Sequence, residues 1–218
     1  HQRKRIISLS EDSIMQEIEQ ISQDKDFKGY LSDLGGPSAN MYLMRGKDES
    51  LCKKCSRPSC LYPTLCKNMN NDHRPLLNLY KKVRALPYIK KAFVGSGVRY
   101  DLFDRSEYFE TLVRYHVSGR LKVAPEHCSE SVLKAMRKMS FDQFIDIKKR
   151  FEIINSKYGL KQQLIPYFIS SHPVCTLKEM AILASKTADL GYKLEQVQDF
   201  TPTPMTISTE MYYTGYDP

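Results

Sequence analysis

The sequence has no apolar run that approaches the roughly 18 residues of a membrane-spanning helix, so we expect no membrane partner. No secretory signal is visible, and the chain begins at His1 rather than Met, as in a processed chain or a fragment. Six cysteines without a secretory context disfavour a disulfide framework and favour metal or redox chemistry in a reducing compartment. We therefore expect a cytoplasmic protein.

The composition is that of an ordinary globular protein with an excess of positive charge. Hydrophobic residues make up 41% and charged residues 27% of the 218 residues. This is enough for one domain, alone or with a small insert. The net charge of +8 makes nucleic acid a possible partner. The basic residues are scattered along the sequence, which is more typical of solvated surfaces, so this partner is not favoured.

Helical patterns recur along the chain. Apolar periodicity predicts helices over about 11–24, from Asp72 onward, over about 106–117, after Ser129, over about 141–157 and over about 177–190. The expected amino-terminal caps are Ser10, Ser129, Ser140 and a capping box of Thr176 with Glu179, and the expected carboxyl-terminal glycines are Gly119 and Gly159.

Short apolar segments lie between these helices and are predicted as strands. They cover about 28–34 and 90–95 and the segments LKVAPEH, QQLIPYFISSHP and LEQVQDFTPTP. Strands that alternate with helices at this spacing require parallel pairing with crossover helices, which defines an α/β fold. The strands lack a clean alternation of apolar and polar residues, as expected when both faces of a sheet are buried.

The carboxyl ends of the predicted strands share an unusual composition. They read GGPSAN, GSGVRYD, APEHC, SSHPVC and TPTP. In parallel α/β folds the functional residues collect at these ends. Because plain connecting loops need no such recurrence of Gly, Pro, Ser, Thr and His, the pattern favours a ligand at this rim.

Residues 45–72 form a polar, cysteine-rich insert between a first part, 1–44, and the remainder, 73–218. Its four cysteines are spaced as Cys52-x2-Cys55-x4-Cys60-x5-Cys66. This spacing suits either tetrahedral zinc or an auxiliary iron–sulfur cluster, and four unrelated reduced cysteines are the plain alternative. Cys128 and Cys175 stand apart and are expected to be packing residues.

Eight collinear stretches resemble the radical SAM superfamily, and specifically its YgiQ family. They are HQRKRIISLS, LGGPSANMY, CKKC with the two following cysteines, DHRPLLNLYKKVRALP, GSGVRYDL, LKVAPEHCSESVLKAM, LIPYFISSHP and VQDFTPTPMTISTEMYYTG. The resemblance implies a partial (β/α)6 TIM-like barrel with a [4Fe–4S] cluster and S-adenosylmethionine (SAM) at its carboxyl rim. It further implies an electron donor and an oxidoreductase whose 5′-deoxyadenosyl radical abstracts hydrogen from an unknown substrate.

One departure from the family pattern is expected to matter. The family holds its cluster with a CxxxCxxC loop after the first strand, and none of the six cysteines has that spacing. The chain therefore resembles a fragment that lacks the first strand and the cluster loop. The parent protein is expected to be an enzyme, whereas the fragment is expected to be inactive and to self-associate through its uncovered edge.

The resemblance assigns the residues after the second strand to SAM. Gly35 and Gly36 correspond to the glycine-rich turn that meets the amino end of SAM through backbone groups. Pro37 stands where the family usually has an acidic residue. Ser38 or Asn40 is expected to replace the contact of that residue.

Other rim residues are assigned to the cofactor in the same way. They are Ser96, Arg99, Lys122, Glu126, Ser170, Ser171, His172, Gln198 and Thr201, with Thr203 beside them. Arg99 fits either a fork on the SAM carboxylate or a surface ion pair. His127 fits a hydrogen-bonded loop residue or a catalytic one.

A second hypothesis comes from another class of protein. The chain would be a non-catalytic basic module in which the cysteine insert is a zinc knuckle that contacts RNA. Retention on nucleic acid with a steep salt dependence, without a cluster, would favour this hypothesis over the first.

Overall fold

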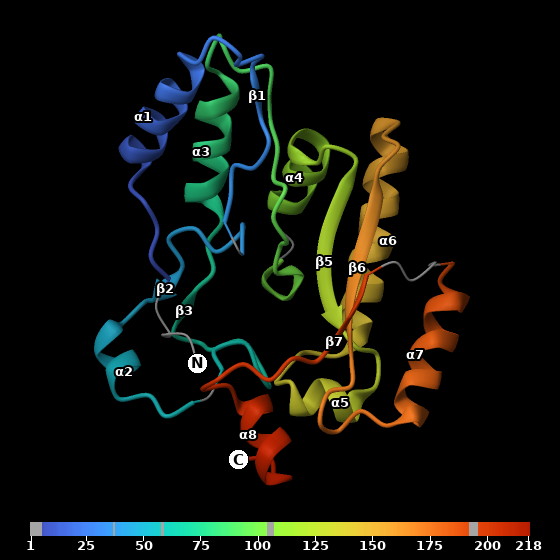
Figure 1. The fold of residues 1–218 in the computed structure, drawn as a ribbon. Coiled ribbons are helices and arrows are strands. Elements are labelled where there is room, and N and C mark those ends of the chain that lie inside the picture. Colours follow the sequence, from blue (N-terminus) through green and yellow to red (C-terminus); the bar gives the residue numbers. More distant parts are fainter. Residues whose placement is uncertain (1–5, 37, 58, 104–106, 192–195) are drawn as a thin grey trace.

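The computed structural model describes residues 6–36, 38–57, 59–103, 107–191 and 196–218. Helices and strands alternate along the chain (Figure 1). The helices are α1 (Glu11–Ser22), α2 (Glu49–Lys53), α3 (Arg74–Arg84), α4 (Tyr108–His116), α5 (Glu130–Ala135), α6 (Phe141–Tyr158), α7 (Leu177–Asp189) and α8 (Ile207–Thr214), with a 3₁₀ turn η1 at Tyr100–Leu102. The strands are β1 (Tyr30–Leu31), β2 (Arg45–Gly46), β3 (Met69–Asn70), β4 (Lys91–Ala92), β5 (Arg120–Glu126), β6 (Gln163–Ser170) and β7 (Val197–Asp199).

The strands between the long helices pair in parallel, so the prediction of an α/β fold with parallel strands is confirmed. β1 pairs with β4, and β5, β6 and β7 pair in that order. A single parallel bridge between Val98 and Val123 links the two groups. β2 and β3 are antiparallel and close the base of the segment that contains the cysteine insert. The result is a mixed α/β architecture with short parallel sheets.

Most predicted caps are confirmed, because they depend only on local hydrogen bonds. The Ser10 hydroxyl accepts the N–H of Ser13, and Ser140 caps α6, which ends at Gly159 with φ of 61°. Thr176 and Glu179 form the predicted capping box of α7.

Two predicted caps are wrong. Ser129 occupies the cap position of α5 but makes no capping bond, because its hydroxyl lies 2.9 Å from that of Ser131. α4 ends at His116 with extended Val117 after it, so Gly119 plays no part in ending the helix.

The expectation that both sheet faces are buried is also wrong. Burial alternates along β5 and β6. Leu121 and Leu164 belong to the hydrophobic core, whereas Lys122 and Ile165 face the more open side. One face of this sheet is therefore covered by helices and the other is partly exposed.

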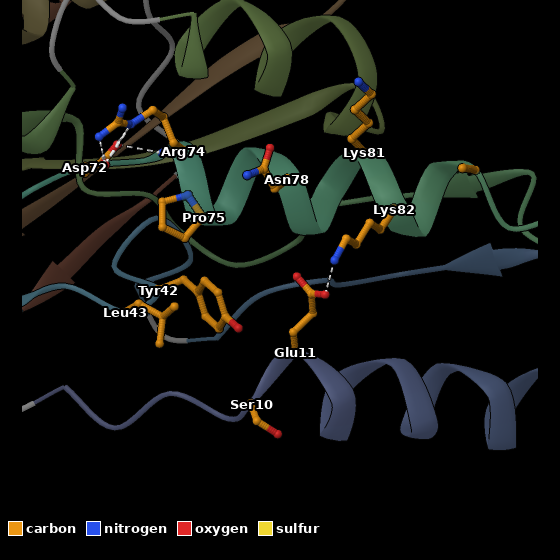
Figure 2. Close-up of a pocket in the computed structure, with 11 residues that line it drawn as sticks. Ser10, Glu11, Tyr42, Leu43, Asp72, Arg74, Pro75, Asn78, Lys81 and Lys82 are labelled. Atoms are coloured by element: carbon orange, nitrogen blue, oxygen red, sulfur yellow. Dashed lines mark hydrogen bonds and ion pairs between the residues drawn. The ribbon is translucent and has the colours of Figure 1, made fainter.

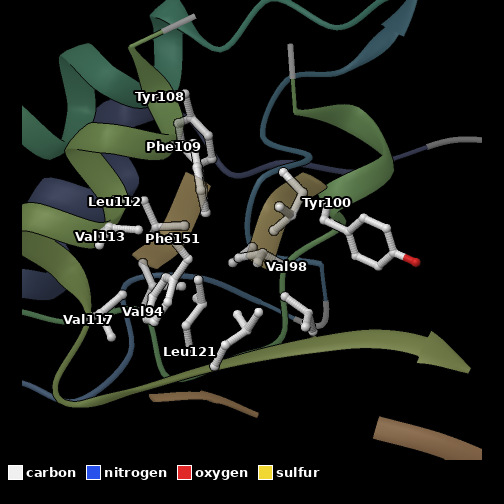
Figure 3. Close-up of a cluster of buried hydrophobic side chains, with 14 of the residues drawn as sticks. Val94, Val98, Tyr100, Tyr108, Phe109, Leu112, Val113, Val117, Leu121 and Phe151 are labelled. Atoms are coloured by element: carbon white, nitrogen blue, oxygen red, sulfur yellow. The ribbon is translucent and has the colours of Figure 1, made fainter. Parts of the chain in front are cut away.

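The core fills the space between that covered face and the helices (Figure 3). Phe109, Leu112 and Val113 of α4 and Phe151 of α6 pack against Leu121 of β5. Burial of each such side chain stabilises the fold by about 1.5–3 kcal/mol. The helices thus anchor the strands from one side and leave their carboxyl ends open. Among the described residues, no helix is both long and apolar enough to cross a membrane.

Candidate functional site at the carboxyl rim

The parallel strands run toward the lower end of the molecule in Figure 1, where β5 ends and where α5, α8 and the cysteine insert lie. We call this end the carboxyl rim. Asp33, just after β1, connects the loop after β1 to the loop after β4. One carboxylate oxygen accepts the N–H of Gly95 at 3.0 Å, and the other accepts the hydroxyl of Ser96. Ser96 is therefore held by Asp33, a residue that the sequence pattern did not indicate.

The two glycines of the opening turn have different surroundings. A Cβ on Gly35 would lie 2.9 Å from the Cβ of Ala39 and 3.0 Å from Asp33 Oδ1, so a side chain there collides with the loop itself. A Cβ on Gly36 would meet no atom within 4 Å. Gly35 is thus required by packing, whereas half-buried Gly36 has room at its Cβ position for a side chain or a ligand atom. Ser38 is half-buried beside them, and Pro37 lies outside the described residues.

Asn40 joins this turn to the next loop. Its side-chain oxygen accepts the N–H of Arg99 at 2.7 Å, and its amide donates to the Arg99 carbonyl at 2.8 Å. Asn40 is fully buried, so it clamps two loops and does not face a ligand. The guanidinium of Arg99 forks onto Asp101, with Nη2 2.5 Å from Oδ2. The structure thus shows the ion pair that we considered for Arg99.

The end of β5 is distorted at the rim. Its pairing with β6 shifts register between Val123 and Glu126, and Glu126 has a positive φ of 67°. Such backbone costs of order 1–3 kcal/mol and is concentrated at functional sites. The Glu126 carboxylate forms an ion pair with Lys138, with 3.0 Å between Oε1 and Nζ. Lys122, on the same strand, is exposed.

His127 faces Cys175, a residue that we expected from the sequence to serve only in packing. His127 is fully buried, and its Nδ1 accepts the N–H of Ser129 at 2.9 Å. The proton of the neutral ring therefore sits on Nε2, which lies 3.6 Å from Cys175 Sγ. Burial lowers the pKa of His127 and raises that of the Cys175 thiol. In this tautomer the His127 ring donates toward the Cys175 sulfur.

The residues after β6 gather around Asp199 at the end of β7. The Ser170 hydroxyl donates to Asp199 Oδ1, and the Ser171 hydroxyl lies 3.5 Å from the same oxygen. Ser171 has a positive φ of 59°. Gln198 and Thr201 flank Asp199 and are exposed. Asp199 is the second acidic rim residue that no motif indicated, and it is accessible to solvent.

His172 is buried below this group. Its Nε2 lies 2.9 Å from the Ser208 hydroxyl, and its ring meets Phe200 edge-on at 5.5 Å. Its Nδ1 has no hydrogen-bond partner in the described part of the chain. Burial, followed by the nearby His127, lowers the pKa of His172. The structure therefore places His172 beneath the rim, where its ring contacts Ser208 of α8 and the ring of Phe200.

The cysteine insert brings its thiols together only in part. Backbone bonds tie Cys55 to Cys52 and Cys66 to Cys60. The Asn68 amide donates to Cys52 Sγ at 3.2 Å. Within the described residues, however, no three His, Cys, Asp or Glu side chains form a group that could hold a metal ion. The proposed metal site of the insert therefore stays a prediction.

A groove of about 750 Å³ runs between α1 and α3 (Figure 2). Tyr42 and Leu43 line it, and four of its five charged side chains pair within it, Glu11 with Lys82 and Asp72 with Arg74, while Lys81 makes no ion pair among the described residues. Because most of these charges already have partners, the groove offers less to a charged ligand than the rim does. The carboxyl rim is the better candidate site.

Known proteins match the whole chain. It is 58% identical over 229 residues to a UPF0313 protein of Porphyromonas gingivalis, 48% identical over 219 residues to one of Methanocella arvoryzae, and 48% identical over 221 residues to one of Clostridium perfringens. Each alignment covers 100% of this chain but only 36%, 37% and 33% of the respective relative. The chain thus spans about a third of the length of the curated relatives it matches. Residues 195–218 match a family described as a domain of unknown function (DUF3362).

Proposed function

We propose that this chain forms the SAM-binding rim of a radical SAM enzyme of the YgiQ type, whose substrate is unknown. The eight collinear sequence blocks support the proposal, as does the similarity to UPF0313 proteins along the whole chain. The parallel strand order β5–β6–β7 and the bridge to the β1–β4 pair are compatible with part of a barrel.

The observation that carries the proposal is the unfilled space at the Cβ position of Gly36. Asp33 and Asn40 fix the loops on both sides of the glycine turn, yet among the described residues no atom lies within 4 Å of a Cβ placed on Gly36. A rigid turn with unfilled space over its backbone is what a ligand bound through main-chain groups requires.

The rim residues fit SAM by their chemistry. The backbone around Gly35 and Gly36 offers hydrogen-bonding groups to the amino-acid end of SAM. The exposed carboxylate of Asp199 is an acceptor suited to ribose hydroxyls, and Ser170 and Ser171 orient it. Gln198 and Thr201 add polar groups beside it.

The iron–sulfur cluster does not fit the residues of this chain. The six cysteines lack the CxxxCxxC spacing, and no three metal ligands are grouped among the described residues. In radical SAM enzymes the cluster and SAM together supply the radical chemistry. We assign no step of that chemistry to this chain and propose that other parts of a longer protein hold the cluster.

Substitution of Gly36 tests the proposal. In the anaerobically reconstituted full-length protein, Gly36→Val is expected to weaken SAM binding by about tenfold or more, because the side chain fills the ligand space. The melting temperature is expected to stay the same, since the new Cβ meets no atom within 4 Å. Calorimetry measures the affinity, and mass spectrometry detects 5′-deoxyadenosine after reduction. Undiminished SAM affinity in the variant, or no cleavage of SAM by the wild type, would refute the proposal.

Gly35→Ala is the matched control. Its Cβ would lie 2.9 Å from the Ala39 Cβ, so overpacking is expected to destabilise the fold by about 1–3 kcal/mol. A loss of stability at Gly35 and a loss of affinity at Gly36 separate the packing role from the ligand role.

A further inference from the structure

The end of the molecule opposite the carboxyl rim carries a cluster of exposed basic side chains. It is formed by the amino ends of the strands and the carboxyl ends of the helices (Figure 1), and we call it the amino pole. Seven exposed cations lie there: Arg84, Lys90, Lys91, Arg114, Arg120, Lys157 and Lys161.

Three of these cations form a row with two tyrosine rings between them. The guanidinium of Arg84 lies 4.0 Å from the ring centre of Tyr115, and that of Arg114 lies 4.7 Å from the same ring. Arg114 also lies 4.4 Å from the ring centre of Tyr158, which Lys157 approaches from 4.9 Å. The row therefore runs without a break across α3, α4 and α6, and the rings hold the guanidinium groups in place.

Carboxylates compensate little of this charge. Of the seven cations, only Lys157 has a carboxylate within 4.0 Å in the described part of the chain, that of Glu110 at 2.7 Å. Asp24 and Asp26 lie in the turn before β1 and Glu19 lies in the last turn of α1, with Lys25 and Lys28 beside them. Glu110 also acts electrostatically on Arg114.

Helix dipoles explain only part of the pattern. A cation in the last turn of a helix is stabilised by about 0.3–1 kcal/mol, which accounts for Arg84, Arg114 and Lys157. The other four cations lie at or just before the starts of strands, where no such dipole acts. Their presence at the same pole calls for another explanation.

We propose that the amino pole binds the phosphodiester backbone of a nucleic acid. Guanidinium forks match phosphate oxygens in geometry, and a row of cations matches the repeating charge of the backbone. The cations over Tyr115 and Tyr158 leave these rings unavailable for insertion into a lipid surface. Binding through phosphates implies little sequence preference. The inference is independent of the function proposed for the rim.

Salt dependence tests this inference. The probe is a fluorescent DNA duplex of about 20 base pairs, titrated between about 50 and about 200 mM salt. Arg84→Gln with Arg114→Gln is expected to reduce the slope of log K against log salt by about 2, because two phosphate contacts are lost. Lys53→Gln with Lys54→Gln, which removes the same charge from the cysteine insert, is expected to leave the slope unchanged.

Equal slopes for both double variants would mean a general effect of net charge and would overturn the proposal. The proposal would also be overturned if the wild type did not bind the duplex. Phosphatidylserine vesicles serve as a second probe, and binding to them alone would likewise count against the proposal. If loss of the tyrosine contacts unfolds the first variant, as circular dichroism would reveal, Lys90→Gln with Lys91→Gln replaces it. That pair lies at the same pole outside the row of rings, and the same reduction of the slope is expected.

Discussion

Asn40 connects two rim loops with a single side chain. Replacing it by Ala removes both hydrogen bonds to the half-buried Arg99 backbone and leaves the Arg99 N–H without its partner, whereas the Arg99 carbonyl still accepts the N–H of Leu102 at 3.2 Å. We expect Asn40→Ala to lower the free energy of unfolding by about 2–4 kcal/mol, measured by urea denaturation. Asn78→Ala, on the exposed face of α3, is the control and is expected to change it by less than about 0.5 kcal/mol. Equal effects of the two changes would contradict the clamp.

His116 is expected to make stability depend on pH. Burial lowers its pKa to about 4, although its Nδ1 is bonded to the Ala92 carbonyl at 2.7 Å. In the unfolded chain the pKa is about 6.5, so the unfolded state takes up a proton first as the pH falls. The contribution of this histidine is fully present above pH of about 6.5 and is lost progressively toward pH of about 4, by on the order of 3 kcal/mol.

His116→Phe tests this origin. Phenylalanine keeps a ring against Tyr80, 4.3 Å away in the wild type, but does not titrate. The variant loses the bond to Ala92 at every pH, so the slopes of stability against pH are compared rather than the absolute values. The slope of the variant between pH of about 6.5 and 4 is expected to be smaller by about one proton. An unchanged slope would assign the pH dependence to other groups, such as His127 and His172.

At the residue scale, sequence reasoning found the rim but not the roles of its members. Ser171 directly follows β6 as expected, whereas Gly36 lies five residues after the end of β1, because that strand is shorter than the expected 28–34. Asp33 and Asp199 were missed, since each acts through hydroxyl and amide partners that only the folded chain brings near. The pairing of Cys175 with His127 spans 48 residues and has no local signal.

At the scale of elements, the caps of α5 and α7 provide a matched pair of substitutions. Thr176→Ala breaks a capping box and is expected to cost about 1 kcal/mol, or about 2–4 °C in melting temperature. Ser129→Ala removes a hydroxyl that makes no capping bond and is expected to have little effect. Calorimetric melting curves of both variants check this. A larger loss at Ser129 would show that its bond to Ser131 is important for α5.

The long amphipathic helices were predictable, and the strands less so. α1, α3 and α6 were found because their apolar side chains recur at helical spacing, and in α1 and α6 a serine cap at the start adds a second signal. The segments expected as strands at 28–34 and 90–95 contain only two paired residues each, β1 and β4, since pairing depends on neighbours distant in sequence. α8 was missed because it is short, at eight residues, and because it directly follows the Thr- and Pro-rich segment expected as a strand end.

The cysteine insert is predicted to be ordered by a bound metal, and this prediction can be checked directly. If Cys52, Cys55, Cys60 and Cys66 share one site, anaerobically purified protein should contain about one zinc, or several irons with sulfide. Elemental analysis distinguishes these outcomes. Cys128→Ser, in the core, is the control and should retain the metal. Metal-free protein with an ordered insert would contradict the prediction.

At the scale of the whole molecule, the proposed function makes SAM binding depend on the cluster. The rim alone offers a few hydrogen bonds of about 0.5–1.5 kcal/mol each, which must offset the cost of immobilising a flexible ligand. The 218-residue chain is therefore expected to bind SAM with a Kd of about 1 mM, or about −4 kcal/mol. Calorimetry compares the SAM affinity of the 218-residue chain with that of the reconstituted full-length protein. Tight binding by the short chain would mean that the rim, and not the cluster, supplies the affinity.

The unequal surroundings of Gly35 and Gly36 also have an evolutionary consequence. Gly35 is kept by the fold, because any side chain collides with Ala39 and Asp33. Gly36 is free to change as far as the fold is concerned, so only selection for the ligand would preserve it. In a lineage that no longer uses this rim, position 36 should drift to larger residues while position 35 remains glycine. Substitutions at position 35 would then report selection on the fold, and substitutions at position 36 would report selection on ligand binding.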